Sequence, residues 1–549
     1  MRFVSIRRAV PACAAFAVAL SLGAPGVASA KAPKTDVLEQ CSGAAKIESE
    51  GSTFQAPAEF LWTGVNSNKS NEPLHTGFNF SSYKLGCSGS QGSGAKPEVY
   101  YNQENGNNRG SGSCLKSWGN GVTTFGETKG TEVYPRVKKF PFCGTDEAPS
   151  EAVKKEFEKL ATPGAEGKIE VEPGKFQEGA AIESIPVAQG AVAIVVHLPK
   201  DCLASSEIVT SKGKKETLGR LALDQEVVEG IYHGSIKTWT EALTKQGSDG
   251  SDTLTCTEGG ASDRIHPVVR EDKSGTTHIF KSFLEQVNNE KIPMEAFSEV
   301  IAEGVGTGEK PCSGGELGAG ALKTWENVAE GCENQRWPEA AEVVRPKEQG
   351  NPGVIKKVNA TESSIGYADL AVAQEEKVFN PPAGGEGKKG EKHKEFWAVL
   401  QNSKPGATPV TFEDPSSKGD GEKEGSSNCK NTNYISAVGT KFPPASTRED
   451  WSKVKGSDVS TTYPICGLTY VLAARQYYYY LAPYFSGSTT KEIEEKSQSI
   501  ATTVHDYLRW SVSTGGGGKV LKNHDYEALP KAVAKEAELG AEEIGSKEG

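Results

Sequence analysis

Four short segments, rich in glycine and hydroxyl side chains, hold the residues best suited to bind an anion. They are Gly51-Ser52-Thr53-Phe54, Gly110-Ser111-Gly112-Ser113, Cys143-Gly144-Thr145-Asp146 and Arg270-Glu271-Asp272-Lys273-Ser274-Gly275-Thr276. Glycine lets the backbone approach a ligand closely, and serine or threonine can cap the helix that follows. The N–H groups at such helix starts form anion sites. Taken singly, each segment is explained more simply as an ordinary helix start.

The elements that would position these segments alternate between strand and helix. Two compact apolar stretches, 188–196 and 463–474, predict buried strands, and 151–160, 277–287 and 493–512 predict helices. Alternation over this length predicts α/β layers with largely parallel sheets. Ligands of such sheets bind at the carboxyl ends of strands, beside helix N-termini. Polar, glycine-rich segments near 243–263, 303–345 and 380–431 predict surface insertions.

The N-terminus has the pattern of a secretory signal peptide over residues 1–30. Met1 to Arg8 carries three arginines, Ala9 to Leu22 is apolar, and Ala28-Ser29-Ala30 offers a small-residue cleavage site. The apolar run is shorter than the ~20 residues that span a bilayer, and no later stretch is longer. A lipid-anchoring cysteine does not follow it. We therefore expect a secreted, extracytoplasmic protein without a lipobox or a transmembrane helix.

Charge and cysteine content narrow the choice of partners. The formal net charge is −11, and losing the three arginines of residues 1–30, which include no acid, leaves −14. Nucleic acid and anionic membranes are poor partners for such a surface. Cys13 leaves with the signal peptide, so ten of the 11 cysteines allow up to five disulfides. Cys312 and Cys332 could close a glycine-rich insertion. Because no Cys/His cluster has zinc spacing, we expect no metal and no cofactor.

In order and content, the four segments resemble those of the phosphate-binding protein of the high-affinity phosphate ABC transporter. That family has a Gly-x-Thr-Phe opening, a Gly-Ser turn, a Ser/Thr-Asp pair before proline and an Arg-x-x-x-Ser-Gly-Thr segment. Further similar blocks are Gly230 to Trp239, Ser364-Ile365-Gly366-Tyr367, Tyr463-Pro464-Ile465 and Asp525 to Pro530. The resemblance covers most of the chain in discontinuous blocks.

The resemblance implies a two-lobed periplasmic-binding-protein type II fold of the α/β class. Its mixed, mostly parallel sheets would carry helices on both faces, with a hinge between the lobes and long loop insertions. The crossovers are expected near Ile185-Pro186 and Tyr463-Pro464. The ranges expected are 31–185 for the first part of lobe 1, 186–462 for lobe 2, 463–540 for the return of lobe 1 and 541–549 for a flexible tail.

The resemblance also implies a phosphate site shared by both lobes. Lobe 1 would supply Thr53, Phe54, Ser111 and Asp146, and lobe 2 would supply Arg270, Ser274, Gly275 and Thr276, with Asp272 supporting Arg270. The expected function is capture of inorganic phosphate as hydrogen phosphate for ABC-type uptake. Its partners would be phosphate and an ABC permease in the membrane, and the chain would be a monomer that binds no nucleic acid.

Asp146 and Arg270 give this expectation its chemistry. The planar guanidinium of Arg270 matches an oxyanion, although an isolated arginine more often forms a surface salt bridge. A carboxylate at Asp146 repels an anion unless the ligand brings a proton. Hydrogen phosphate has one and sulfate at neutral pH has none, so the site would discriminate between them. The simpler role of Asp146 is to cap the helix at Glu151 or to start the turn at Glu147.

The sequence departs from the family pattern in two cysteines, in the length of one segment and at Gln55. Cys114 and Cys143 flank ligand positions, the segment between Phe54 and Gly110 is long, and Gln55 replaces a proline, a change that we expect to be neutral.

Two other functions stay open. One alternative is an exported phosphoesterase or other hydrolase with Ser111 or Ser274 as nucleophile. No Gly-x-Ser-x-Gly or HExxH motif supports it, so no catalytic residue is expected. The other is a cell-surface interaction protein that has lost the ligand.

Overall fold

The structure is a computed structural model of the whole chain. It describes residues 46–63, 98–101, 110–112, 140–151, 153–155, 168–172, 175–178, 181–200, 202–245, 253–256, 263–288, 290–293, 296–298, 322–329, 334–378, 394–404, 407–418, 425–436, 441–457, 462–481, 489–522 and 524–546. The predicted signal peptide, Cys114 and the Cys312 and Cys332 pair lie outside these residues. No helix among them is both long and apolar enough to cross a membrane.

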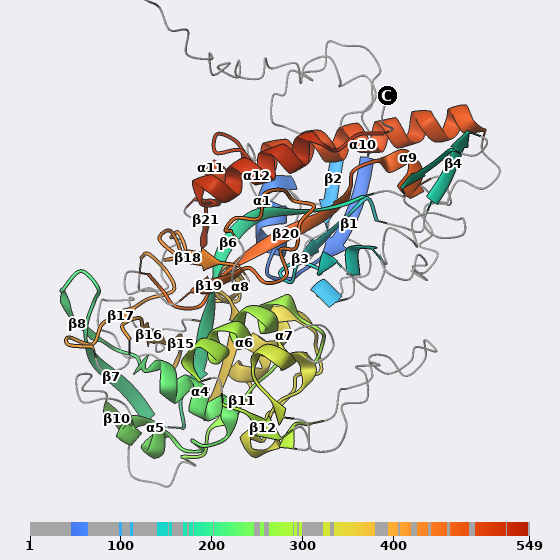
Figure 1. The fold of residues 1–549 in the computed structure, drawn as a ribbon. Helices are drawn as coiled ribbons and strands as arrows, with labels where there is room; N and C mark the ends of the chain where they lie inside the picture. Colours follow the sequence, from blue (N-terminus) through green and yellow to red (C-terminus); the bar gives the residue numbers. More distant parts are fainter. Residues whose placement is uncertain are drawn as a thin grey trace, which may run out of the picture.

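A nine-stranded mixed sheet runs through the middle of the molecule (Figure 1). Its strands follow the order β11-β14-β6-β20-β3-β1-β2, and β15 and β21 also pair with β6. The bounds are β1 Lys46–Gly51, β2 Glu98–Tyr101, β3 Phe142–Thr145, β6 Ile182–His197, β11 His266–Pro267, β14 Ser364–Asp369, β15 Glu395–Trp397, β20 Cys466–Ala474 and β21 Tyr526–Glu527.

Strand β6 is the longest strand described and is buried along all 16 residues. Its first part pairs with β20 and its last part, from Val192 to His197, pairs with β14. The predicted strand 188–196 is therefore confirmed, and it begins six residues earlier than expected. The register shifts opposite Pro186, where Thr469 and Tyr470 of β20 meet the bulge. A bulge accommodates proline because proline has no N–H for the ladder.

The mixed α/β class is confirmed, but the expected predominance of parallel pairing is wrong for the described strands. β1 pairs in parallel with β2 and β3, and β11 with β14. By contrast, β6 runs antiparallel to β14, β15, β20 and β21, and β20 runs antiparallel to β3. The physical reason is that the two long strands β6 and β20 run in opposite directions through the centre. β14 runs in the direction of β20 and pairs with β6, and β3 runs in the direction of β6 and pairs with β20, so both pairs are antiparallel.

The helices form two groups at the two ends of this sheet (Figure 1). The terminal group lies with β1, β2 and β3, which are drawn from blue to teal, and its later helices are drawn from orange to red. It contains α1 Ala56–Thr63, α9 Tyr477–Leu481, α10 Thr490–Val512, α11 Gly517–Leu521 and α12 Lys531–Glu542. The middle group, drawn green to yellow with β11 and β14, contains α4 Gln225–His233, α5 Trp239–Lys245, α6 Gly275–Val287, α7 Gly350–Asn359 and α8 Leu370–Glu375. The helices predicted over 277–287 and 493–512 are confirmed.

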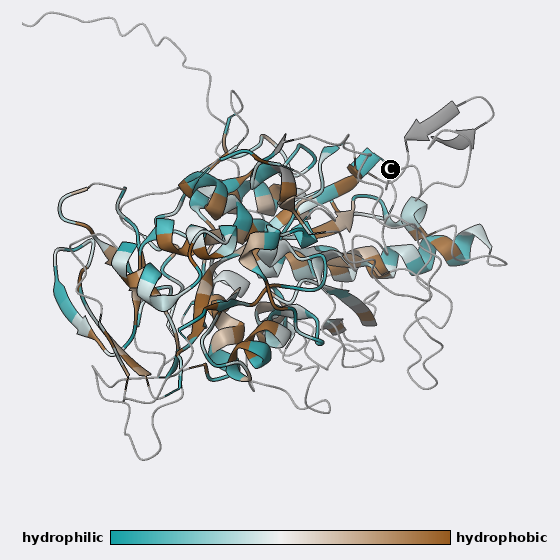
Figure 2. Ribbon diagram, turned by 90° about the horizontal axis from the view of Figure 1, so that it is seen from below, coloured by the Kyte–Doolittle hydropathy of each residue, from teal (hydrophilic) through white to brown (hydrophobic). Residues whose placement is uncertain are grey.

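Smaller sheets and two 3₁₀ helices surround this framework. They are β4 Lys168–Glu172 with β5 Lys175–Glu178, β7 Cys202–Val209 with β8 Lys215–Leu218 and β10 Thr253–Cys256, β9 Ala222–Leu223 with β16 Val399–Gln401 and β17 Phe412–Glu413, β12 Ile292–Pro293 with β13 Leu322–Lys323, β18 Asn433–Ile435 with β19 Lys455–Ser457, and the 3₁₀ turns Glu326–Val328 and Glu339–Ala341. Apolar residues, brown in Figure 2, concentrate in the interior strands and helices.

Parts of two predicted surface insertions belong to the core. In the range 303–345, Trp325 and Trp337 are almost fully buried. The buried ammonium of Lys281 on α6 donates to three carbonyl oxygens of this stretch, including that of Val328 at 3.0 Å. In the range 380–431, Phe412 is buried. Glycine and charge in these ranges concealed the aromatic residues that pack inward, which is why the composition was misleading.

The predicted flexible tail is also partly wrong, because residues up to 546 are held in place. The Gly545 N–H donates to the Arg475 carbonyl at 2.8 Å, and the Tyr478 N–H donates to Ser546 at 2.8 Å. Backbone pairing of this kind needs no side-chain signal, so composition could not reveal it.

Disulfides are present, as the even cysteine count predicted. Cys202 bonds to Cys256 across β7 and β10, and Cys429 bonds to Cys466 at the start of β20. Cys143 in β3 is also disulfide-bonded. The bond at Cys466 ties the first residue of β20 to Cys429, and Cys143 lies in the strand that ends just before Asp146.

Candidate anion-binding site

The four predicted segments meet where the terminal and middle groups face each other. From the terminal group come the turn after β1, the short helical start at Ser111 and the end of β3 at Asp146. From the middle group come the loop after β11 and the start of α6. All nine predicted site residues are buried. Segments from Gly51 to Thr276, which are 276 − 51 = 225 residues apart in sequence, therefore assemble into one polar cluster.

The carboxylate of Asp146 is the centre of the cluster. The Ser52 hydroxyl lies 2.5 Å from both of its oxygens, and the Thr469 hydroxyl lies 2.8 Å from Oδ1. Ser111 contacts it twice, because its Oγ accepts from the Asp146 N–H at 3.2 Å and lies 3.4 Å from Oδ2. The carboxylate is thus surrounded by hydroxyl donors.

Burial dominates the acid strength of this carboxyl. Desolvation raises the pKa of Asp146 to about 6, and its bonds to Ser52 and Thr469 and the charge of Arg270 only partly offset that rise. Asp146 therefore gains or loses its proton in a pH range in which hydrogen phosphate is also present. A buried carboxyl with such a pKa accepts a proton more readily than an exposed one.

Arg270 lies opposite with its side chain 2% exposed. Its Nε and Nη2 form a fork on the Asp272 carboxylate, with Nε 2.7 Å from Oδ1, and its Nη1 donates to the Asn351 Oδ1 at 3.1 Å. Desolvation lowers the pKa of Arg270, but the adjacent Asp272 more than offsets it, so the pKa is raised overall. The guanidinium is held in a fixed orientation with its charge intact.

The start of α6 supplies backbone donors. Ser274 is the N-cap, and its side chain accepts from the Thr277 N–H at 3.2 Å. The N–H groups of Gly275 and Thr276 belong to the first turn, where a helix offers no acceptor of its own. A Cβ on Gly275 would lie 2.6 Å from the Asp146 Cβ and 2.8 Å from the Ser111 Oγ. Only glycine lets this helix start approach the carboxylate so closely.

Asn351, the second residue of α7, bonds to both groups. Its N–H donates to the Thr53 hydroxyl at 3.2 Å, and its side-chain amide donates to the Thr276 hydroxyl at 3.3 Å. The same side chain accepts from Arg270, as described above. A further link across the groups runs from the Gly112 N–H to the Lys273 carbonyl at 3.3 Å. These bonds hold the two groups together around the cluster.

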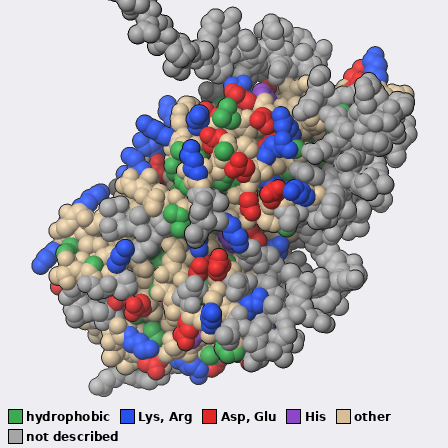
Figure 3. All heavy atoms as spheres, in the orientation of Figure 1, with side chains coloured by type: hydrophobic (Ala, Val, Ile, Leu, Met, Phe, Trp, Pro, Cys, Tyr) green, Lys and Arg blue, Asp and Glu red, His purple; other side chains and the backbone are tan. Residues whose placement is uncertain are grey.

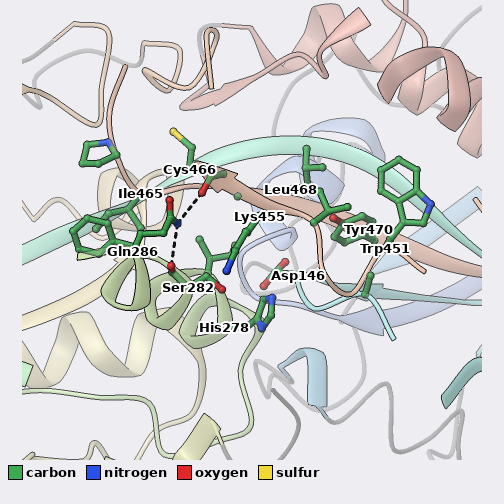
Figure 4. Close-up of a pocket in the computed structure, with 17 residues that line it drawn as sticks. Asp146, His278, Ser282, Gln286, Trp451, Lys455, Ile465, Cys466, Leu468 and Tyr470 are labelled. Carbon is green, nitrogen blue, oxygen red and sulfur yellow. Dashed lines mark hydrogen bonds between the residues drawn. The ribbon is translucent and has the colours of Figure 1, made fainter. Parts of the chain in front are cut away.

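A narrow pocket opens beside Asp146, between α6 and the start of β20 (Figure 4). His278, Gln286 and Lys455 line it, with room for one or two water molecules at about 20 Å³. The Gln286 amide spans it by donating to the Ser282 carbonyl at 2.9 Å and the Gly456 carbonyl at 2.8 Å. Water can therefore reach Asp146 from this side.

The structure brings all the predicted site residues together and adds four that the sequence interpretation missed. Phe54 lies in the cluster as well, but its backbone N–H already donates to the Ser52 hydroxyl at 3.0 Å. The added residues are Ser52, Gln55, Asn351 and Thr469. Ser52 stood in a predicted segment, and a serine that opens a turn, where its hydroxyl accepts from the Phe54 and Gln55 N–H groups, was a usable signal. Asn351 and Thr469 had no local signal, since the pairing of distant elements places them.

Comparison with known proteins adds three similarities. The curated phosphate-binding protein PstS of Methanocaldococcus jannaschii is 23% identical over 320 residues, which is 57% of this chain and 59% of that protein. This chain thus matches less than two thirds of that relative's length. A solved phosphate-binding protein from Stenotrophomonas maltophilia is 14% identical with a TM-score of 0.48, covering 90% of this chain and 94% of the other. A human phosphate binding apolipoprotein is 14% identical with a TM-score of 0.43, covering 89% and 93%.

A family model provides the broader match. The model described as the PBP superfamily domain matches residues 170–513, which include β6, α6 and β20. That range holds Arg270, Asn351 and Thr469 of the site, whereas Asp146 precedes it. Because the match covers well over half of the chain and the strands and helix that organise the cluster, this protein belongs to the PBP superfamily.

Proposed function

We propose that this protein captures inorganic phosphate, as hydrogen phosphate, between its terminal and middle groups of elements. The observation that carries this proposal is the pairing of opposite chemistries in one buried cluster. Arg270 and the first turn of α6 offer charge and N–H donors to an oxyanion, while the Asp146 carboxylate faces them from the other group. A ligand that satisfies both must be an anion that still carries a proton.

The attraction for the anion is local. Figure 3 shows Lys and Arg side chains interspersed with Asp and Glu over the visible face, so that face has no field of a single sign. The helix start contributes roughly half a positive charge. Arg270 contributes a full one, which the bonded Asp272 carboxylate partly offsets. Both act inside a buried cluster, where screening by water is weak. An acidic protein can therefore bind a phosphate dianion.

Two lobes would close over the ligand. Lobe 1 would comprise 31–185 and the return segment 463–540, and lobe 2 would comprise 186–462. The chain would cross between them at β6 and again just before β20. Only the closed arrangement satisfies donors from both lobes at once, so phosphate would shift the population toward closure. The Asn351 bonds to Thr53 and Thr276 support this role for the interface.

The same geometry argues for binding without turnover. Ser274 is occupied as a helix cap, and Ser111 bonds to Asp146. Among the described residues, no histidine ring bonds to the hydroxyl of either serine, and the His278 Nδ1 lies 3.2 Å from the Ala329 carbonyl. Neither hydroxyl therefore has the histidine base that would activate it for ester hydrolysis. We propose a non-enzymatic phosphate carrier outside the cell, a monomer that delivers its ligand to an ABC permease.

The first test is calorimetric titration of protein stripped of bound ligand. We expect tight binding of phosphate and arsenate at pH 7.5. Sulfate should bind at least about 10²-fold more weakly, because a site built around a hydrogen bond strongly rejects the analogue that lacks it. Absence of heat with phosphate would overturn the proposal and favour an interaction protein. Robust p-nitrophenyl phosphate hydrolysis that is lost in Ser274→Ala would favour the hydrolase.

Gly275→Ala should weaken phosphate binding without unfolding the chain. Its Cβ would lie 2.6 Å from the Asp146 Cβ, so the start of α6 would have to retreat from the carboxylate. We expect a loss of about ten- to hundredfold in affinity, since misplacing one partner weakens several hydrogen bonds at once. Gly213→Ala is the matched control, because no atom lies within 4 Å of its Cβ position and it is far from the cluster, although its φ of +74° brings a local strain. Equal effects of both variants would contradict the close-approach argument.

A further inference from the structure

A row of buried side chains connects Asp146 to a second carboxyl, Glu59 on α1. The Thr469 hydroxyl lies 2.8 Å from the Asp146 Oδ1 and 3.0 Å from the Gln55 Oε1. The Gln55 Nε2 donates to the Glu59 Oε1 at 2.6 Å, and the Tyr507 hydroxyl donates to the Glu59 Oε2. Glu59, Gln55 and Thr469 are all fully buried. Each contact in this row joins two side chains, so the hydrogen atoms of the row can be placed in only a few ways.

The Thr469 hydroxyl has one proton but faces three acceptors. Besides Asp146 and Gln55, the Thr145 carbonyl lies 3.3 Å away. While Glu59 is ionised, it holds the Gln55 N–H groups and turns the Gln55 carbonyl oxygen toward Thr469. The Thr469 hydroxyl can then donate its proton either to the Gln55 carbonyl oxygen or to the Asp146 carboxyl. If it donates to Gln55, the lone pairs of its oxygen face Asp146, and that contact is favourable only when Asp146 carries a proton.

The opposite arrangement suits an ionised Asp146. A protonated Glu59 donates to the carbonyl oxygen of a flipped Gln55 amide, whose N–H then donates to Thr469. The Thr469 hydroxyl is left to donate to Asp146. The reversal needs an amide flip and a hydroxyl rotation, and no proton passes through the amide. The protons come from the bulk solvent, and Asp146 lines a water-sized pocket.

We propose that near neutral pH Glu59 and Asp146 hold one proton between them, and that Gln55 and Thr469 transmit its position from one carboxyl to the other. Glu59 is then a positioning residue of the phosphate site: when it is neutral, Asp146 is the ionised acceptor that hydrogen phosphate needs. This inference rests on the proposed function for its consequence, but the coupling itself does not require a ligand.

The surroundings of each carboxyl favour this distribution of charge. Desolvation raises the pKa of Glu59 to about 7, above that of Asp146 at about 6. Tyr507 from α10 bonds to Glu59, and Tyr101 from β2 is a second ionisable neighbour. Asp146 is faced by Arg270, by Asp369 at the end of β14 and by Tyr470 of β20, and His278 lines the same pocket. As the pH falls from 8, Glu59 takes up a proton before Asp146 does.

Glu59→Gln separates this inference from a purely structural role. The Gln side chain keeps the donor toward Gln55 and cannot ionise, so Asp146 stays in the acceptor state at high pH. In the wild type at pH 8, phosphate binding should take up close to one proton, and affinity should fall by up to about tenfold per pH unit above pH 7. In Glu59→Gln, proton uptake should vanish and affinity should be flat from pH 7 to 9. Calorimetry in buffers of different ionisation enthalpy measures both.

Glu183→Gln is the matched control. Glu183 is another buried carboxyl with a raised pKa, bonded to Thr447 away from the site. Its replacement should leave proton uptake at pH 8 unchanged. Uptake that persists in Glu59→Gln, or that disappears equally in Glu183→Gln, would overturn the inference.

A measurement without phosphate keeps the two proposals separable. In protein carrying ¹³C-labelled glutamate carboxyls, Asp146→Asn should move the Glu59 titration to lower pH, because the Asn amide donates toward Thr469 and so orders the row for an ionised Glu59. Thr469→Val should abolish that movement, as expected for partners coupled through one hydroxyl. A Glu59 titration that ignores Asp146→Asn would overturn the coupling even where phosphate binds. A titration that moves in protein that binds no phosphate would retain the coupling and reject the phosphate function.

Discussion

Arg270→Ala should weaken phosphate binding by about 10²- to 10⁴-fold. The guanidinium is buried, and Asp272 and Asn351 fix its orientation, so it meets an oxyanion with no reorganisation. Hydrogen bonds to charged groups contribute about 1.5–3 kcal/mol each, and the N–H groups that Asp272 and Asn351 leave on Nη1 and Nη2 can make two of them. Each 1.4 kcal/mol corresponds to a tenfold change in affinity. Calorimetric titration of stripped protein at pH 7.5 measures the effect.

The same substitution leaves Asp272 buried without its partner, so lost stability has to be separated from lost binding. Breaking a buried pair typically costs about 3–5 kcal/mol because one charge stays uncompensated. Arg270→Ala with Asp272→Ala removes both charges and should recover most of that stability, as measured by urea unfolding, while phosphate affinity stays low. Arg270→Lys keeps the charge but loses the fork and should bind with intermediate affinity. Tight binding by the double variant would contradict the role assigned to Arg270.

The sequence was informative where a site residue belongs to a local pattern. Arg270 and Ser274 stand in one short segment with a glycine and a following helix, and a helix start has the same physics wherever the chain places it. The structure therefore puts them together as predicted. Ser111 and Asp146 lie in separate segments, and only the resemblance to a family suggested that they meet. The buried apolar runs likewise located β6 and β20.

What the sequence did not reveal depends on pairing between distant elements. Thr469 lies in an apolar strand, and it reaches Asp146 only because β20 pairs with β3 next to that carboxyl. Asn351 reaches Thr53 because α7 packs where the two groups meet. Gln55 was expected to be a neutral replacement of proline, yet its amide contacts both Thr469 and Glu59. None of these contacts leaves a periodic or motif-like trace in the chain.

Asp146→Asn should narrow the preference for phosphate over sulfate from about 10²-fold or more to less than about tenfold. The Asn side chain keeps the shape and one acceptor oxygen, but its NH₂ donates to an anion and no longer requires a proton on the ligand. Sulfate should gain affinity, and phosphate should lose some, while Arg270 and the start of α6 still hold either anion. Competition calorimetry at pH 7.5 with both anions gives the ratio. An unchanged ratio would show that the carboxylate does not read the ligand's proton.

This variant should also change how the stability of the ligand-free protein depends on pH, and the sign follows from the raised pKa. Folding raises the pKa of Asp146 from 3.8 to about 6, so the folded state binds more protons than the unfolded state between those values. Wild-type stability due to this group therefore falls as the pH rises from about 4 to about 6 and stays lower above that range. Asparagine cannot ionise, so Asp146→Asn should be more stable than wild type by up to about 3 kcal/mol at pH 7.5, with little difference at pH 3.5. Urea unfolding at both pH values tests this, and a variant that is less stable at pH 7.5 would mean that the hydroxyl donors around the ionised carboxylate outweigh its desolvation.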